Sequence, residues 1–148
     1  MLAAGSGRRF RASGGRGDKL QALLHGQPVL DHVLQAVRAS GLPWHLERGP
    51  HPHMGDSISA AVAVCPDAGG WLVLPGDLPL IRADTLTRLA SFEPADRIAR
   101  AVWQGQPGHP VRFPADCRER LLGLRGQDGA SALITERGCL SVEVDDPG

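Results

Sequence analysis

The segment GWLVLPGDLPLI, at residues 70–81, constrains the fold more than any other part of this 148-residue chain. Its apolar run, ended by Pro75 and Gly76, predicts a strand that is buried on both faces. Strands of that kind belong to sheets that helices cover on each side. The segment therefore indicates an α/β domain, with Asp77 just beyond the carboxyl end of a buried strand.

Strand and helix patterns alternate on both sides of this segment. Helices are predicted over residues 28–41 and 56–65, with shorter ones at 83–92, 116–124 and 128–138. Asp56 or Ser57 is the expected N-cap of the second helix. Further strands are predicted at 1–4, within 43–53, and at 97–103, 109–113 and 139–145. This alternation predicts a single domain over 1–148 with a mainly parallel sheet.

Composition excludes several classes of protein. The 16 Lys and Arg residues balance 16 Asp and Glu residues, so the globally basic surface of a nucleic-acid-binding protein is absent. The three cysteines are far apart and form no CxxC pair, which favours reduced, packed thiols. No apolar run is long enough to span a bilayer, and no secretory signal is evident. We expect a cytoplasmic protein without a membrane or nucleic-acid partner.

The opening segment, MLAAGSGRRFRASGGRGDKL, carries the local positive charge. A strand that runs into glycines exposes backbone N–H groups, which bind anions such as phosphate. Neither common phosphate motif fits, because Phe10 replaces the third glycine of a dinucleotide fingerprint and Lys19 is not followed by Ser or Thr. Lys19 is the only lysine beside fifteen arginines, which indicates a site that needs a compact point charge. The alternative is a solvated basic loop.

Asp77 is a candidate metal ligand. In a parallel sheet it lies at the same edge as the opening segment, where ligands of open α/β sheets bind. Mg²⁺ prefers one or two carboxylates together with substrate phosphates. The alternative is an aspartate that caps a helix or stabilises a turn.

The histidines divide into two groups. His45, His51 and His53 lie in a proline-rich stretch without well-spaced further ligands, so we interpret them as part of a solvated loop rather than a zinc site. His109 stands between Gly108 and Pro110 in what is expected to be a rigid turn. The residue type alone does not decide whether His109 has a structural or a functional role.

Six stretches taken together resemble one family. LAAGSGRRF followed by DKL, then GQPVLDHVL, MGDSI, WLVLPGDLPLI, GHPVRF and GQDGA occur in the order found in MobA-like nucleotidyltransferases, over nearly the whole chain. The branch that transfers cytidylate to the molybdenum cofactor is the most similar, since the guanylyl branch more often has LAGG. The resemblance implies a Rossmann-like, three-layer fold of the glycosyltransferase-A type.

The resemblance also implies roles for particular residues. Arg9 and Lys19 correspond to basic residues on the triphosphate, and Asp77 corresponds to the Mg²⁺ (or Mn²⁺) ligand. The implied nucleotide-binding residues are Leu2, Ala3, Ala4, Gly5, Ser6, Gly7, Lys19, Gly55, Asp56 and Ser57. The implied acceptor-binding residues are Gly108, His109, Pro110, Asp128 and Gly129.

The implied activity is transfer of CMP from CTP to the molybdopterin form of the molybdenum cofactor, with release of pyrophosphate. Two alternatives stay open. One keeps the fold but uses another nucleotide, such as GTP, or another phosphorylated acceptor. The other is a non-catalytic protein that carries the cofactor to a molybdenum hydroxylase, which the short stretch between Leu42 and Met54 motivates because the family has a full strand and a further helix there.

Overall fold

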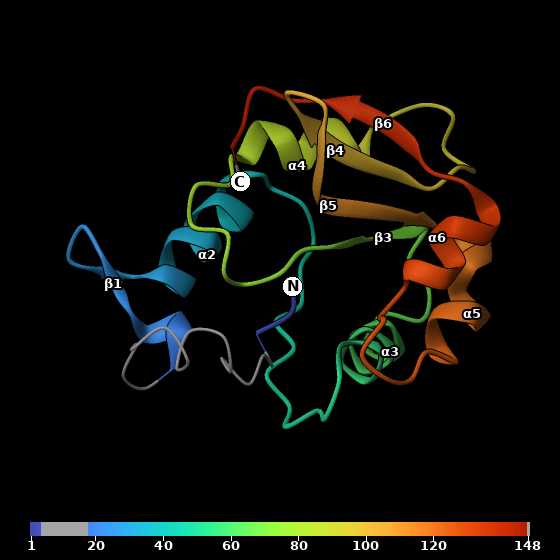
Figure 1. Ribbon diagram of the computed structural model, residues 1–148, viewed down its shortest axis with the longest axis horizontal. Coiled ribbons are helices and arrows are strands. Elements are labelled where there is room, and N and C mark those ends of the chain that lie inside the picture. The colour runs from blue at the N-terminus through green and yellow to red at the C-terminus, as the bar shows by residue number, and fades with distance from the viewer. Residues whose placement is uncertain (4–17, 148) are drawn as a thin grey trace.

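The computed structural model describes residues 1–3 and 18–147, and Figure 1 shows how their elements are arranged. The sheet contains β3 (Gly70–Val73), β4 (Ala99–Trp103), β5 (Gln106–Pro114) and β6 (Leu140–Glu143) in the order β3-β5-β4-β6. Leu2 extends it beyond β3, because it forms parallel bridges with both Pro75 and Glu47. Of the first predicted strand, Leu2 forms these bridges and Ala4 lies outside the described residues.

The sheet is mixed, and the expectation of a mainly parallel sheet is wrong. β5 pairs antiparallel with both β3 and β4, and only β4 and β6 pair in parallel within the four-stranded sheet. The cause is the link between β4 and β5, where Gln104 and Gly105 both have positive φ, at 50° and 75°. A two-residue turn of this kind can join only antiparallel strands.

Helices cover both faces of the sheet, as the sequence predicts for an α/β domain. On one face lie α2 (Val29–Ala39) and α4 (Ala83–Ala90), and Leu89 of α4 packs against Ala99 and Ala101. On the other lie α3 (Met54–Val64), α5 (Arg118–Leu122) and α6 (Ser131–Arg137), which pack against Val111 and Phe113. Figure 1 shows α3, α5 and α6 gathered beside the ends of β3 and β5.

The helices lie where the sequence predicts them, but one predicted N-cap residue is wrong. α2 follows Pro28, and Gly41, with φ of 69°, follows its end. The expected N-cap of α3 is wrong, because His53 occupies that position and α3 begins at Met54. A neighbouring loop supplies the missing partner, since the backbone N–H of Gly55 donates to the carbonyl of Gly126 at 2.9 Å.

Three small elements are absent from the sequence predictions: the 3₁₀ turn η1 (Lys19–Gln21) and the two strands of a hairpin, β1 (Leu23–Leu24) and β2 (Gln27–Pro28). A second 3₁₀ turn, η2 (Ala115–Cys117), stands at the start of the helix predicted over 116–124. Figure 1 shows the hairpin projecting from the body of the protein beside α2. Elements of two or three residues are too short to create a detectable periodicity.

The strand β3 is less buried than its apolar sequence predicts. Leu74 is buried, but Trp71, Leu72 and Val73 are only half-buried. The prediction of burial on both faces therefore holds at the carboxyl end of the segment and fails along β3 itself.

The three cysteines are free, in agreement with the sequence analysis. No helix within residues 1–3 and 18–147 is long and apolar enough to cross a membrane.

The C-terminal segment is tied to the start of α4 by a buried carboxylate. Asp146 is 4% exposed and accepts hydrogen bonds from the backbone N–H of Arg82 at 2.8 Å and from the hydroxyl of Thr85 at 2.7 Å. A carboxylate at a helix N-terminus satisfies free backbone donors and complements the helix dipole. Asp146 thus caps α4 from a distant part of the chain.

We expect Asp146→Ala to lower the free energy of unfolding by about 1–3 kcal/mol, because two donors lose their acceptor in a buried place. Chemical denaturation monitored by circular dichroism measures the change. The matched control is Asp145→Ala, because Asp145 is the exposed neighbour and its carboxylate has no hydrogen bond to another of the described residues. Equal effects of the two substitutions would contradict this role of Asp146.

Candidate active site

Two residues that are distant in the sequence form the centre of the candidate site. The ammonium of Lys19 and the carboxylate of Asp77 make a hydrogen-bonded ion pair. Their side chains are 29% and 37% exposed, so both remain accessible to a ligand. The pairing agrees with the prediction that the two residues share one sheet edge.

Gly76 places Asp77 against the first residues of the chain. Its backbone N–H donates to the carbonyl of Leu2 at 2.7 Å. A Cβ atom at this position would lie 3.1 Å from that carbonyl oxygen and 3.1 Å from Cδ1 of Leu30. Glycine is therefore what lets the Asp77 loop approach the beginning of the glycine-rich segment so closely.

Lys19 is placed by the 3₁₀ turn η1 and its buried neighbour. The carboxylate of Asp18 accepts from the backbone N–H of Leu20 at 3.0 Å and caps the turn. Leu20 is 3% exposed and packs with Leu30 and Leu34 of α2. Leu30 thus contributes to the placement of both members of the ion pair.

His109 lies within the long strand β5, so the expectation of a rigid turn is wrong. Gly108 and Pro110 flank it in the same strand. Arg100 of β4 pairs with Val111, and the register of the two strands shifts just beyond this pair, between Arg100 and Val102. Arg100 lies close enough to His109 for its charge to act on the imidazole. Sequence reasoning missed Arg100, although a cation inside the apolar run IARAVW was a usable signal.

The electrostatics of His109 favour its neutral form. Burial lowers the pKa of His109, and the positive charge of Arg100 lowers it further, against opposing contributions from the backbone of Val73 and the charge of Asp77. Within the described residues, its Nδ1 atom is buried and has no hydrogen-bond partner. Arg100 likewise has a buried Nε atom without a partner in the same part of the chain.

The motifs MGDS and GQDGA, assigned to opposite substrates by the resemblance, lie next to each other. A Cβ atom at Gly55 would lie 2.8 Å from the backbone of Arg125, and one at Gly129 would lie 3.0 Å from the side chain of Met54. Both glycines are therefore needed for the close approach of α3 to this loop. Gly129 also has a φ of 55°, which favours glycine.

The polar residues of these motifs differ in exposure. Ser57 is buried and its hydroxyl donates to the carbonyl of His53 at 3.3 Å, whereas Asp128 is exposed. Oδ2 of Asp56 is buried without a partner among the residues that the structure describes. In that part of the chain, no hydrogen bond or ion pair joins Asp56 or Asp128 to the Lys19–Asp77 pair.

Part of the predicted nucleotide site lies outside the described residues, namely Ala4, Gly5, Ser6, Gly7 and Arg9. Leu2 and Ala3 lie within them and are held on both sides. The N–H of Leu2 donates to the carbonyl of Leu74 at 2.8 Å, and the N–H of Ala3 donates to the carbonyl of Glu47 at 2.8 Å. The segment that leads to the glycines therefore starts from a fixed position between Glu47 and Asp77.

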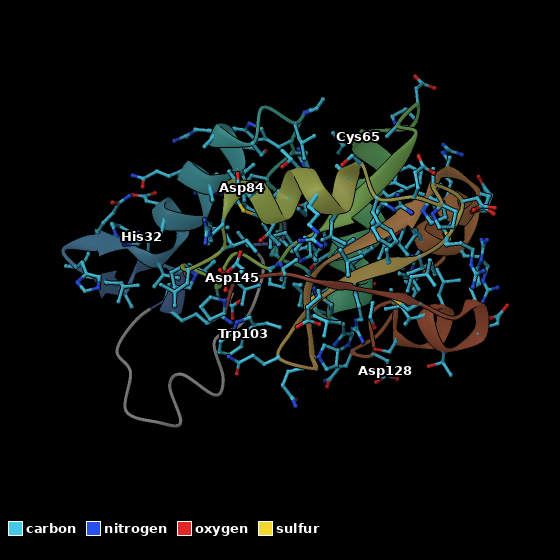
Figure 2. All side chains as sticks on the ribbon, turned by 90° about the horizontal axis from the view of Figure 1, so that it is seen from above. His32, Cys65, Asp84, Trp103, Asp128 and Asp145 are labelled. Carbon is cyan, nitrogen blue, oxygen red and sulfur yellow. The ribbon has the colours of Figure 1, made fainter. Side chains whose placement is uncertain are left out.

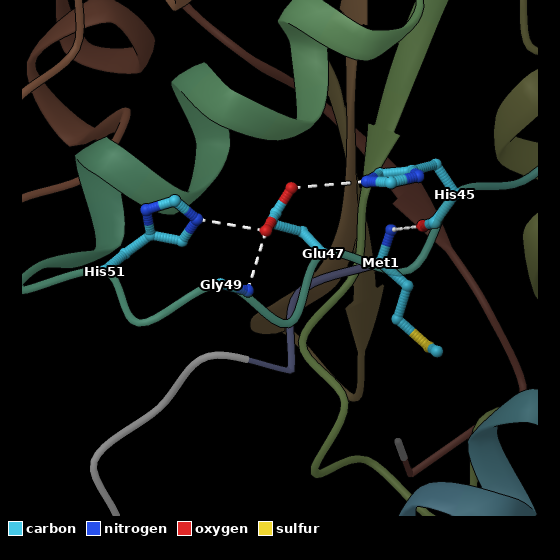
Figure 3. Close-up of polar contacts among 5 residues, drawn as sticks. All are labelled: Met1, His45, Glu47, Gly49 and His51. Carbon is cyan, nitrogen blue, oxygen red and sulfur yellow. Dashed lines mark hydrogen bonds and ion pairs between the residues drawn. The ribbon is translucent and has the colours of Figure 1, made fainter.

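Glu47 is the centre of a polar cluster that the sequence analysis did not predict (Figure 3). Its carboxylate accepts from the backbone N–H of Gly49 at 2.8 Å and contacts His51 at 3.0 Å and His45 at 3.2 Å. The interpretation of His45 and His51 as merely solvated is therefore wrong. These contacts lower the pKa of Glu47 to about 2, and the hydrogen bond from the Gly49 N–H makes the largest contribution.

Asp77 could bind a divalent cation only together with ligands from a substrate. The described residues contain no group of three or more His, Cys, Asp or Glu side chains arranged to hold a metal. Asp77 nevertheless offers a partly exposed carboxylate, and hard cations such as Mg²⁺ are commonly held by one carboxylate together with substrate oxygens. The donor set fits a metal that arrives with its substrate.

We expect Glu47 to stabilise the protein above pH 4.5 and to lose this effect as the pH falls toward 2. The pKa is lower in the folded protein than the ordinary value of 4.5, so the native state favours the charged form. Glu47→Gln should lower the free energy of unfolding by about 1–3 kcal/mol at pH 7. The difference from the wild type should shrink below pH 4.5, as measured by urea unfolding between pH 7 and 3. A difference that does not depend on pH would contradict this assignment.

The chain is similar to several known proteins. It is 31% identical to the bifunctional protein GlmU of Xylella fastidiosa strain 9a5c over an alignment of 141 residues, and this alignment covers 76% of this chain and 29% of GlmU. The chain thus spans less than a third of the length of that relative.

Among solved structures, Rv0371c of Mycobacterium tuberculosis matches with a TM-score of 0.78 and 21% identity, over 97% of this chain and 85% of that one. Rv0371c has also been crystallised in complex with manganese, and that structure matches with a TM-score of 0.72 and 20% identity, over 86% of this chain and 81% of the other. Molybdopterin-guanine dinucleotide biosynthesis protein A of Archaeoglobus fulgidus matches with a TM-score of 0.63 and 17% identity, over 97% and 82% of the two chains. At these identities the structures establish the fold.

The family follows from the match between residues 1–141 and the model of the MobA-like NTP transferase domain. Since this match includes both members of the Lys19–Asp77 pair and almost the whole described sheet, the chain belongs to the MobA-like NTP transferase domain family.

Proposed function

We propose that this NTP transferase domain moves a nucleoside monophosphate from an NTP to a phosphorylated acceptor at the edge marked by Lys19 and Asp77. The observation that carries the proposal is the ion pair between these two side chains, next to the point where Leu2 and Ala3 lead into the glycine-rich segment. An oxygen of the acceptor phosphate forms a bond to the α-phosphorus, and the bond from that phosphorus to pyrophosphate breaks. Such a transfer needs positioning and charge neutralisation more than covalent chemistry.

Lys19 supplies the mobile cation of this site. Without a ligand its charge is neutralised by Asp77, and both groups keep about a third of their side-chain surface exposed. A triphosphate offers Lys19 several anionic oxygens, so binding replaces one ion pair by another. The compact ammonium on a flexible stem suits this exchange better than the planar guanidinium of arginine.

Asp77 would hold a divalent cation together with the substrate phosphates. When bound, such a cation neutralises negative charge on the triphosphate. The manganese complex of Rv0371c supports a divalent metal for a protein of this fold. The release of Asp77 from Lys19 makes the carboxylate available at the moment when Lys19 turns to the phosphates.

In our proposal, His109 and Arg100 bind the acceptor. A neutral imidazole with a free Nδ1 can exchange a hydrogen bond with a ligand, and Arg100 forms no ion pair with a carboxylate of the described residues. A partly buried guanidinium without an anion is costly, and a planar fork is well suited to phosphate. Arg100 therefore favours an anionic acceptor.

Cytidylate transfer to molybdopterin is the specific reaction that we propose. The LAAG sequence supports cytidylate as the transferred group. The GHPV sequence and the similarity of the fold to molybdopterin-guanine dinucleotide biosynthesis protein A support molybdopterin as the acceptor. Pyrophosphate release with CTP, GTP and ATP, each with molybdopterin-type acceptor and Mg²⁺, tests it. Release with CTP alone is expected. Release with GTP alone would instead assign the guanylyl reaction, and binding of nucleotide without release would favour the carrier for a molybdenum hydroxylase.

We expect Lys19→Ala and Asp77→Asn each to lower the rate of pyrophosphate release by roughly 10²–10³-fold, because each removes a charge that acts directly on the substrate phosphates. The matched control is Asp84→Asn, since Asp84 is a highly exposed carboxylate that pairs with Arg82 at the surface. Thermal unfolding of all three variants should stay close to that of the wild type. Lys19→Arg with full activity would contradict the need for a point charge.

We expect Arg100→Met to raise the KM for the acceptor at least roughly tenfold and to leave the KM for the NTP nearly unchanged. The long apolar side chain of methionine keeps the packing of the arginine stem while removing the charge. Arg88→Met on the exposed side of α4 is the control. Steady-state kinetics with each substrate varied in turn give the two constants, and an effect confined to the NTP would exclude Arg100 from the acceptor side.

A further inference from the structure

The predicted nucleotide site has two parts that come from distant segments of the chain. One begins at Leu2 and Ala3 and continues into the glycine-rich segment, and the other is Gly55, Asp56 and Ser57 in the first turn of α3. Oδ2 of Asp56 is buried and has no hydrogen-bond partner within the described residues, so a ligand can supply one. One nucleotide can contact both parts only if their relative position is fixed.

Glu47 is attached to the first part through its backbone. It bridges Leu2 in parallel, and its carbonyl accepts a hydrogen bond from the N–H of Ala3 at 2.8 Å. The neighbouring Leu46 packs with Leu20 in the cluster beside α2. Side chains alternate along bridged segments of this kind, so the carboxylate of Glu47 lies on the other face, which α3 covers (Figure 3).

The same carboxylate holds the chain that leads to the second part. Its Oε1 atom accepts from the N–H of Gly49 at 2.8 Å and contacts Nε2 of His51 at 3.0 Å, and its Oε2 atom contacts Nε2 of His45 at 3.2 Å. Only 12% of the Glu47 side chain is exposed, so water competes little for these contacts. Hydrogen bonds to a charged acceptor are also stronger than those between neutral groups. Glu47 is therefore a firm anchor for His51.

The chain between His51 and α3 is short and stiff. Pro50 and Pro52 flank His51, and the N–H of His51 donates to the carbonyl of Gly49 at 2.9 Å. Proline fixes its own φ angle and restricts the residue before it. The helix α3 begins three residues after His51. The contact between the His51 side chain and Glu47 therefore sets the direction in which the chain enters α3.

The first turn of α3 is held from two sides. On one side the N–H of Gly55 donates to the carbonyl of Gly126, and a Cβ atom at Gly55 would lie 2.8 Å from the backbone of Arg125. On the other side the chain enters from His51, and His53 at the N-cap position makes no side-chain hydrogen bond to the helix. The anchored chain at His51 is therefore what ties this turn to the first part of the site.

We propose that Glu47 is a positioning residue of the NTP site: its backbone holds the start of the glycine-rich segment, while its carboxylate holds the chain that enters α3 at the turn of Asp56. This role rests on the proposed function, because it requires the NTP to contact both parts. A nucleotide then meets a site that is already ordered, so its affinity is not reduced by the free energy of ordering residues 49–53. Glu47 acts through the backbone and need not touch the nucleotide.

Glycine at position 49 is what lets this cluster form. A Cβ atom at Gly49 would lie 2.6 Å from Nε2 of His51 and 2.9 Å from Oε1 of Glu47. Gly49→Ala therefore separates the two groups without removing a polar atom. At Gly69 an added Cβ atom meets nothing within 4 Å, so Gly69→Ala is the matched control.

The experiment measures the Kd for CTP, GTP and ATP, each with Mg²⁺, by isothermal titration calorimetry. His51→Leu removes the donor to Glu47, whereas His51→Gln keeps an N–H donor near the position of Nε2. For the nucleotide that the wild type binds, we expect His51→Leu and Gly49→Ala to raise the Kd about tenfold, because these variants must order residues 49–53 on binding. His51→Gln and Gly69→Ala should retain the wild-type Kd. The kcat of pyrophosphate release should stay close to that of the wild type in all four variants, because Lys19 and Asp77 are unchanged.

Hydrogen exchange locates the effect without a ligand. The amide of Ser57 lies in the first turn of α3 and that of Cys65 directly follows its last turn, and both are hydrogen-bonded. Figure 2 shows Cys65 far from Asp128, whose loop lies at the first turn. We expect His51→Leu to speed exchange of the Ser57 amide at least about tenfold, through local opening, and to leave the Cys65 amide unchanged.

The outcomes separate this role from the proposed function. A wild-type Kd in His51→Leu and Gly49→Ala would overturn the role of Glu47 and leave the proposed function intact. Equal losses of affinity in His51→Leu and His51→Gln would also overturn it, since the donor would then not matter. So would equally faster exchange at Ser57 and Cys65, because the whole helix would then be loosened. A wild-type protein that binds none of the three nucleotides would contradict the proposed function itself, and this role with it.

Discussion

The two-sided pairing of Leu2 and Ala3 is the interaction on which the rest of the site depends. Backbone hydrogen bonds join these residues to Glu47 on one side and to Leu74 and Gly76 on the other. They bring together parts of the chain that are more than forty residues apart, with no side chain taking part. Because backbone bonds of this kind are directional and buried, they set the position from which the glycine-rich segment starts and at which Asp77 is presented.

Glycine makes this arrangement possible at two places. Gly76 lets the Asp77 loop lie against Leu2 and Leu30, and Gly55 lets α3 lie against the loop at Arg125. In both cases an added Cβ would meet neighbouring atoms at 3.1 Å or less. The glycines of the short motifs LPGD and MGDS are therefore, at least in part, requirements of packing.

The candidate site combines a neutralised pair with a cation and an imidazole that form no ion pair within the described residues. Lys19 and Asp77 satisfy each other, whereas Arg100 and His109 each keep a buried nitrogen without a partner in the same part of the chain. The first arrangement is stable without a ligand and can open when phosphate arrives. The second leaves buried nitrogen atoms that a ligand could satisfy, and our proposal of an anionic acceptor rests on it.

The residues along the chain determined where the main helices and strands lie and the α/β class, and they marked Lys19 and Asp77 as candidates for the site. The periodicity of apolar residues, the Pro-Gly after the buried run and the single lysine are local signals. Each can be read from a short segment without knowing what the segment packs against. Tertiary structure alone decided the direction of β5, the His45–Glu47–His51 cluster and the position of Arg100 close to His109. Each of these depends on which segments become neighbours in space. The order of residues along the chain does not say which strand will pair with which, or which distant side chain will contact a given carboxylate.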